Sequence, residues 1–272
     1  MNSFKALAIL AGGYAMTASP LAAQDAAAPA PQMTEAAAVQ QAVDLGSKIY
    51  SYDQAAWHGT DAMLEDLPGA RKNGIAGWIV NEVAGGWETV FFRLAGEGYE
   101  AVWAGVYDGK KVIRAATYAP GERALTPAET ALVTATQLAR SQRVQGCSAK
   151  PFNTVVFPTG RPDGGFYAYL LTPQEKVGEI PFGGHHRFEI VAGQIKASRK
   201  FTNSCLTMAS LAADGKRPEA LSISHLLDPV PTEIHVFSVY VAGLPVYVLT
   251  ASNKTAWAVE VSGGKPRIRR VE

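Results

Sequence analysis

Residues 183–190 have the sequence GGHHRFEI and lie between Cys147 and Cys205, the only two cysteines of the chain. Residues 186–192 and 194–201 form two strand-like runs separated by the single glycine Gly193, and polar and apolar side chains alternate over residues 187–190. Two such runs joined by a glycine turn predict a β-hairpin. The segment between the cysteines is therefore expected to be mainly β-structure.

The first 23 residues predict the compartment. A short basic start at Lys5 precedes an apolar run over residues 6–18, and small residues follow up to Ala23. This pattern is typical of a secretory signal peptide and is too short for a spanning helix. Cleavage is expected after Ala23, with Ala28 as the second choice. The sequence therefore predicts a periplasmic or secreted protein.

Export favours a disulfide between Cys147 and Cys205, because thiols are oxidised outside the cytosol. No Cys-x-x-Cys is present, so neither a zinc knuckle nor a thioredoxin-type site is predicted. The bond would close a loop of 205 − 147 = 58 residue steps, which stabilises a fold by about 4 kcal/mol. The alternative is a free nucleophilic cysteine, Cys205, beside His185 or His186.

Charge and hydropathy exclude several classes of partner. The chain has 25 basic and 24 acidic residues, and removal of Lys5 with the signal peptide leaves 24 of each. A neutral protein is poorly suited to nucleic acid or to an anionic membrane surface. After residue 23 no run of eighteen apolar residues occurs, so no membrane span is expected. No cofactor is predicted, because no nucleotide-binding glycine loop is present.

Residues 24–33 are rich in Ala and Pro and predict a disordered leader. Residues 34–272 are expected to form a single α+β domain, with a possible subdivision near residues 120–147. A helix is predicted from Thr34 to about Ile49 and a second short helix over residues 53–67. The period then changes to two, which predicts an antiparallel meander over residues 75–118.

The second half of the domain begins with a well-capped helix. Thr126-Pro127-Ala128-Glu129 is a capping box with proline in the first helical position, and Gly146 follows the helix. Strands are predicted at residues 154–158 and 166–171, before the hairpin, and a second antiparallel meander closes the chain. Its four strands are predicted at residues 233–241, 245–251, 255–261 and 266–271. The predicted fold class is therefore α+β, with two antiparallel β-meanders, an N-terminal helical segment and one central helix.

The best candidate site is the run His185-His186-Arg187-Phe188-Glu189. Because residues two apart in a strand share a face, His185, Arg187 and Glu189 are candidate catalytic residues that could form a polar cluster. A metal site would use His185 and Glu189 with a distant third ligand, His225 or His235. The alternative is an ordinary exposed strand face on which Arg187 and Glu189 form an ion pair.

Three function classes remain open. A non-catalytic periplasmic protein that binds a small ligand or another periplasmic protein is favoured, because no complete catalytic motif is present. Neither a Gly-x-Ser-x-Gly elbow nor a Ser-x-x-Lys with Lys-Thr-Gly occurs. The alternatives are a hydrolase, using His185 with Glu189 or Cys205 with a histidine, and a metal-dependent protein that uses the His185/His186/Glu189 region.

Overall fold

The computed structural model describes residues 33–69, 74–211 and 215–271. The chain divides into two units, Met1–Met33 and Thr34–Glu272, and the second contains the helices and strands of the described residues. The predicted signal peptide lies outside the described residues, as does the predicted leader apart from Met33. No helix within the described ranges combines the length and the apolar character that a membrane crossing requires.

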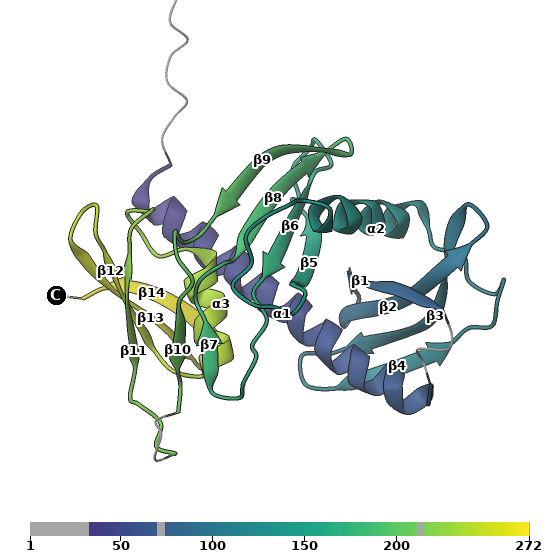
Figure 1. Ribbon diagram of the computed structural model, residues 1–272, viewed down its shortest axis with the longest axis horizontal. Helices are drawn as coiled ribbons and strands as arrows, with labels where there is room; N and C mark the ends of the chain where they lie inside the picture. Colours follow the sequence, from purple (N-terminus) through teal and green to yellow (C-terminus); the bar gives the residue numbers. More distant parts are fainter. Residues whose placement is uncertain (1–32, 70–73, 212–214, 272) are drawn as a thin grey trace, which may run out of the picture. The chain divides into compact units, whose positions relative to one another are not determined.

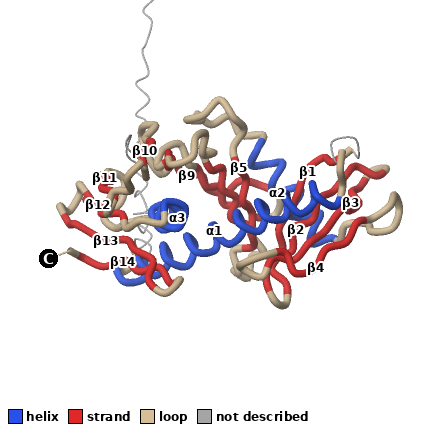
Figure 2. Tube along the Cα trace, turned by 90° about the horizontal axis from the view of Figure 1, so that it is seen from below, coloured by secondary structure: helices blue, strands red, loops and turns tan. Residues whose placement is uncertain are grey.

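A single long helix, α1 (Glu35–Asp66), replaces the two helices predicted for this region. Thr34 caps its start by accepting a hydrogen bond from the Ala37 amide at 3.2 Å. No proline interrupts the 32 residues. The two glycines within them, Gly46 and Gly59, are buried against other elements and do not end the helix. α1 packs against the first sheet and against α3 (Glu233–Ala242); both helices are blue in Figure 2.

The predicted first meander is confirmed. It consists of β1 (Ile75–Val83), β2 (Gly86–Ala95), β3 (Gly98–Tyr107) and β4 (Val112–Thr117), paired antiparallel in that order (Figure 1). Trp103 is fully buried in it, and its indole nitrogen donates to Asp66 Oδ2 of α1 at 2.7 Å. Trp103 and Phe91 therefore belong to a core cluster with Met63 near the end of α1.

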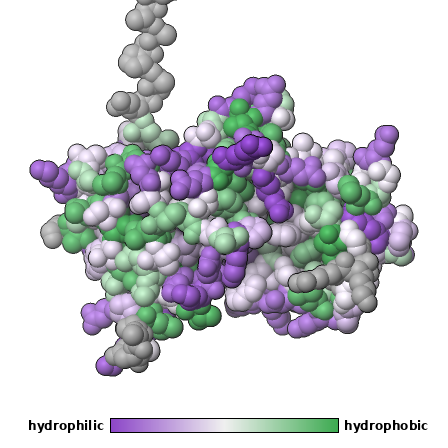
Figure 3. Space-filling view, viewed as in Figure 1, coloured by the Kyte–Doolittle hydropathy of each residue, from purple (hydrophilic) through white to green (hydrophobic). Residues whose placement is uncertain are grey.

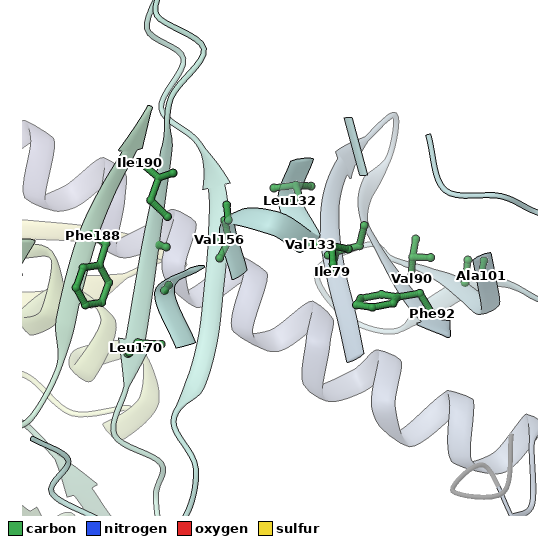
Figure 4. Close-up of a cluster of buried hydrophobic side chains, with 14 residues drawn as sticks. Ile79, Val90, Phe92, Ala101, Leu132, Val133, Val156, Leu170, Phe188 and Ile190 are labelled. Carbon is green, nitrogen blue, oxygen red and sulfur yellow. The ribbon is translucent and has the colours of Figure 1, made fainter. Parts of the chain in front are cut away.

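The central helix, α2 (Pro127–Arg140), begins with the predicted Thr126–Glu129 capping box. It packs against the second sheet, in which the strands have the order β5-β6-β8-β9. Figure 4 shows side chains of α2 between those of the first and second sheets. The strands of the second sheet are β5 (Asn153–Pro158), β6 (Phe166–Leu171), β8 (His186–Val191) and β9 (Gln194–Lys200).

The closing region differs from the prediction in one element. Residues 233–241, predicted as a strand, belong to the helix α3. α3 connects β11 (Leu221–His225) to β12 (Val246–Thr250), which pair in parallel, so the sheet is mixed rather than a pure meander. The helix is buried on nearly all sides, so its sequence, rich in β-branched and aromatic residues, has no polar face to reveal the helical period. Gly243 ends it in the left-handed conformation.

The last three predicted strands of the chain are confirmed, whereas β11 and the two short strands described below were not predicted. β13 (Thr255–Ser262) and β14 (Lys265–Arg270) complete an antiparallel run with β12. Two short strands, β7 (Glu179–Pro181) and β10 (Thr207–Ala209), pair with each other. On the face shown in Figure 3, hydrophilic and hydrophobic residues are interspersed. The α+β class is confirmed.

The predicted disulfide is also confirmed. Cys147 and Cys205 are bonded, with their Cα atoms 5.4 Å apart. The bond joins the segment after α2 to the segment after β9. Both cysteines are used in it, so the alternative of a free nucleophilic Cys205 is wrong.

Candidate ligand-binding site

His185 is a buried structural residue. It lies directly before β8 and has no exposed surface. Its Nδ1 accepts a hydrogen bond from the Thr172 amide at 3.1 Å, and its Nε2 donates to the Pro181 carbonyl at 3.0 Å. Burial lowers its pKa to about 4. The imidazole is therefore neutral, and both nitrogens are used by the backbone, so it has no free lone pair for a proton or a metal ion.

Arg187 and Glu189 share a strand face, as the alternation predicts, and the guanidinium donates to Glu189 Oε1 at 3.2 Å. The stronger contact of Arg187 is with Glu233 in the first turn of α3, at 2.6 Å. Glu233 also accepts from the Tyr169 hydroxyl at 3.2 Å. These largely buried charges join the second sheet to α3. His185 is not part of this network, so the predicted cluster of three does not form.

The candidate metal ligands are held in separate hydrogen bonds. His235 accepts from the Thr232 amide at 2.9 Å, and burial lowers its pKa to about 3. His225 contacts the His235 ring edge-on and bonds Asp228 at 2.7 Å. Within the described part of the chain, no three His, Cys, Asp or Glu side chains gather in a way that could hold a metal ion.

A cavity of about 350 Å³ lies between α1, α3 and the segment that connects β6 to β7. Its walls combine aromatic rings with uncharged polar groups and one carboxyl group. α1 and α3 supply eight of the lining side chains: Tyr50, Asp53, Gln54 and Trp57, and Phe237, Ser238, Tyr240 and Val241.

The third wall of the cavity depends on His185. Thr172 and Pro181 both line the cavity, and they are the two residues that the His185 ring joins. The Thr172 hydroxyl adds a bond to the Gly183 carbonyl at 2.8 Å. His185 therefore stabilises one wall of the cavity, and its ring takes no part in the chemistry of the site.

Asp53 gives the cavity its electrostatic character. Burial raises its pKa to about 6, and a hydrogen bond from the Gln54 side chain acts in the opposite direction. None of the ion pairs found among the described residues includes Asp53. The nearby Tyr50 has a raised pKa as well, through its burial and then through the Asp53 charge.

Two further features involve α3. The Ser238 hydroxyl is buried and has no hydrogen-bond partner among the described residues. The rings of Tyr50 and Tyr240 are stacked, with centroids 4.5 Å apart and an 8° angle between their planes. A buried hydroxyl without a partner costs about 1–3 kcal/mol, so a ligand that bonds Ser238 would recover that cost.

A second cavity, of about 410 Å³, lies beside α2 and is lined by Trp78, Phe92 and Arg140 among others. Its one charged group, Arg140, is exposed. It therefore lacks the partly buried, unpaired charge that distinguishes the cavity at Asp53.

Sequence reasoning missed the Asp53 cavity. Asp53 belongs to no motif, and the residues on α3 were assigned to a strand, which would have placed them differently. Comparisons with protein-family models, with curated proteins and with solved structures found no match. The site is therefore interpreted from its own geometry.

Proposed function

We propose that this protein is exported and that it is a non-catalytic binding protein whose ligand is a small molecule held in the cavity between α1 and α3. One observation carries the proposal: the cavity presents an unpaired carboxyl group, Asp53, and a buried hydroxyl without a partner, Ser238. A carboxyl group without an ionic partner and a hydroxyl without a hydrogen-bond partner, both on a cavity lined in part by aromatic rings, are typical of ligand sites.

Export is supported by the disulfide and by the predicted signal peptide at residues 1–23. A bond of this kind persists in an oxidising compartment and is rare in a reducing one. A periplasmic location is the form of export that we propose.

The absence of a catalytic pair at the cavity favours binding over catalysis. A hydroxyl nucleophile needs a base within hydrogen-bond reach, and Ser238 has none among the described residues. His185, the candidate base, is behind the wall with both nitrogens bonded. Turnover of ester, peptide or glycan substrates that is lost in Asp53→Asn would overturn the non-catalytic part of the proposal.

The test is a fragment screen by ligand-observed NMR on the folded mature protein. Ser238→Leu fills the cavity from α3, and Gln174→Trp narrows it from an exposed loop position that also lines it. Val177→Trp is the matched control, because Val177 is in the same loop, is 93% exposed and does not line the cavity.

We expect hits that bind the wild type and the control and that bind both cavity variants at least about tenfold more weakly. The loop variant keeps the test informative if Ser238→Leu does not fold. Hits that bind all four proteins equally would show that the cavity is not the site.

A further inference from the structure

The cavity wall carries negative charge and no positive charge. Among the described residues that line it, Asp53 is the only one with a formally charged side chain, and none is Lys, Arg or His. The carboxylate also lacks a cationic partner elsewhere in the described chain. A partly buried charge of this kind is costly until an opposite charge is brought beside it.

Aromatic rings surround the same space. Tyr50, Trp57, Phe237 and Tyr240 line it, and the Trp57 side chain is 56% exposed. The face of an aromatic ring is electronegative and attracts cations, tryptophan most strongly. The carboxylate and the rings therefore favour the same sign of ligand charge.

We infer that the ligand is a small organic cation, an amine or a quaternary ammonium compound, whose charged nitrogen lies between Asp53 and the aromatic rings of the cavity. This inference rests on the proposed function and names its ligand class. The Ser238 hydroxyl accepts an ammonium hydrogen or bonds a hydroxyl of the ligand. A cavity of about 350 Å³ limits the ligand to the size of a small metabolite rather than a folded partner.

Other ligand classes fit less well. An anion would be repelled by the Asp53 carboxylate and would find no donor of positive charge on the wall. A neutral ligand would exclude water from that carboxylate without replacing its hydration, unless the carboxyl group took up a proton. A cation offsets the cost of the buried charge and leaves the carboxyl group ionised.

The experiment is a calorimetric titration of the folded protein with two matched sets of probes. One set is choline, its neutral isostere 3,3-dimethyl-1-butanol and the anion 3,3-dimethylbutanoate. The other is phenethylamine, 2-phenylethanol and phenylacetate. Within at least one set, the cation is expected to bind about tenfold or more tightly than the neutral compound, and the anion is expected not to bind.

Asp53→Asn should remove this preference, lowering cation affinity about tenfold and leaving the neutral compounds unchanged. Asp61→Asn is the matched control, because Asp61 is exposed on the same helix and does not line the cavity. Equal or tighter binding of neutral or anionic probes, or no binding of either cation at millimolar concentration, would overturn the inference.

Binding should also weaken as the pH falls. With a pKa of about 6, Asp53 is mostly ionised at pH 7 and mostly protonated at pH 5. Because the protonated carboxyl group, like the amide in Asp53→Asn, should bind the cation about tenfold more weakly, cation affinity should fall about fivefold between these pH values. The other ionisable groups on the wall are the phenols of Tyr50 and Tyr240, and burial raises the pKa of Tyr50 above its ordinary value of 10.0. His185, behind the wall, stays neutral because its pKa is about 4.

A constant cation affinity from pH 7 to pH 5 would assign recognition to a group other than Asp53 and overturn the inference. The proposed function would be distinguished by the cavity variants. If fragments of any charge lose affinity in Gln174→Trp but not in Val177→Trp, the cavity remains the site and only the ligand class is wrong.

Discussion

At the residue scale, the ionised Asp53 side chain lowers the free energy of unfolding of the unliganded protein, although it gives the cavity its charge. Its pKa rises from the ordinary 3.8 to about 6 on folding. The unfolded chain therefore loses this proton first, and the free energy of unfolding falls as the pH rises from about 4 to about 6. Above pH 6 the cost is fully present.

Asp53→Asn should therefore stabilise the unliganded protein by roughly 1–3 kcal/mol at pH 8, and the gain should shrink toward zero near pH 4. Urea unfolding at the two pH values measures the difference, with Asp61→Asn expected to stay within about 0.5 kcal/mol of the wild type. A loss of stability at pH 8 would mean that the carboxylate already has a partner that stabilises it.

The pH dependence that His185 gives to the free energy of unfolding has the opposite sign to that of Asp53. Its pKa is lowered from 6.5 to about 4 by burial, so its contribution to stability is present above pH 6.5 and is lost as the pH falls toward 4. His185→Ala leaves the Thr172 amide and the Pro181 carbonyl without partners and should cost about 2–4 kcal/mol at pH 7.5.

Chemical unfolding from pH 7.5 to pH 4.5 measures this effect, and the variant should lose less stability on acidification than the wild type does. His186→Ala is the control, because His186 is only partly buried and makes one bond, to the Gln145 carbonyl. An unchanged acid response in His185→Ala would contradict the assigned role of this histidine.

The sequence identified some of these residues but not their roles. The Arg187–Glu189 pairing could be predicted, because strand alternation determines which side chains share a face. The burial of His185 could not, since it depends on a residue thirteen positions earlier and on β7. Asp53 gave no signal, because its raised pKa arises from surroundings contributed by other elements.

At the element scale, the contact between α1 and α3 depends on Gly46. A Cβ atom at this position would lie 2.5 Å from Val236 Cβ and 2.7 Å from the Glu233 carbonyl oxygen, so the two helices approach too closely for any side chain. Gly46 therefore permits the close contact between α1 and α3, the two helices that line the cavity. It lies one helical turn before Tyr50.

Gly46→Ala should lower the free energy of unfolding by about 1–3 kcal/mol through overpacking, although alanine has the better helix propensity by about 1 kcal/mol. Thermal unfolding with Gln41→Ala, an exposed position on the same helix, as control measures the effect. A more stable Gly46→Ala protein would show that the helices leave room for a side chain at this position.

Elements with a local signal could be predicted from the sequence, and those without one could not. The Thr126–Glu129 capping box and the period of two over residues 75–118 depend on near neighbours, and both predictions are correct. α3 was missed because it is buried on nearly all sides, so burial in the whole molecule, rather than its own period, stabilises it as a helix.

At the scale of the whole molecule, one covalent bond restricts the unfolded chain. Cys147–Cys205 spans 58 residues, and replacing both cysteines with serine should lower the free energy of unfolding by about 4 kcal/mol. Denaturant unfolding measures the loss, and the wild type under reductant should match the variant. A change below about 1 kcal/mol would show that the bond is not a major source of stability.

The cavity is also a property of the whole molecule. Its walls come from residues 50–57, from Asn153, and from residues 171–181 and 237–241, which belong to separate elements of the chain. These segments meet because α3 packs across α1. The hydrogen bonds of His185 to Thr172 and Pro181 also hold together the two ends of the segment between β6 and β7. A single sequence contains no local pattern for such a meeting, so the cavity could not have been predicted from it.

The most direct test of this cavity as the binding site is ¹⁹F NMR of the protein labelled with 5-fluorotryptophan. The chain has five tryptophans, and only Trp57 lines the cavity between α1 and α3. On addition of the tightest ligand from the screen, the Trp57 resonance, assigned with Trp57→Phe, should shift while the other four stay in place. A shift of Trp78, beside the α2 cavity, with Trp57 unmoved would contradict the account.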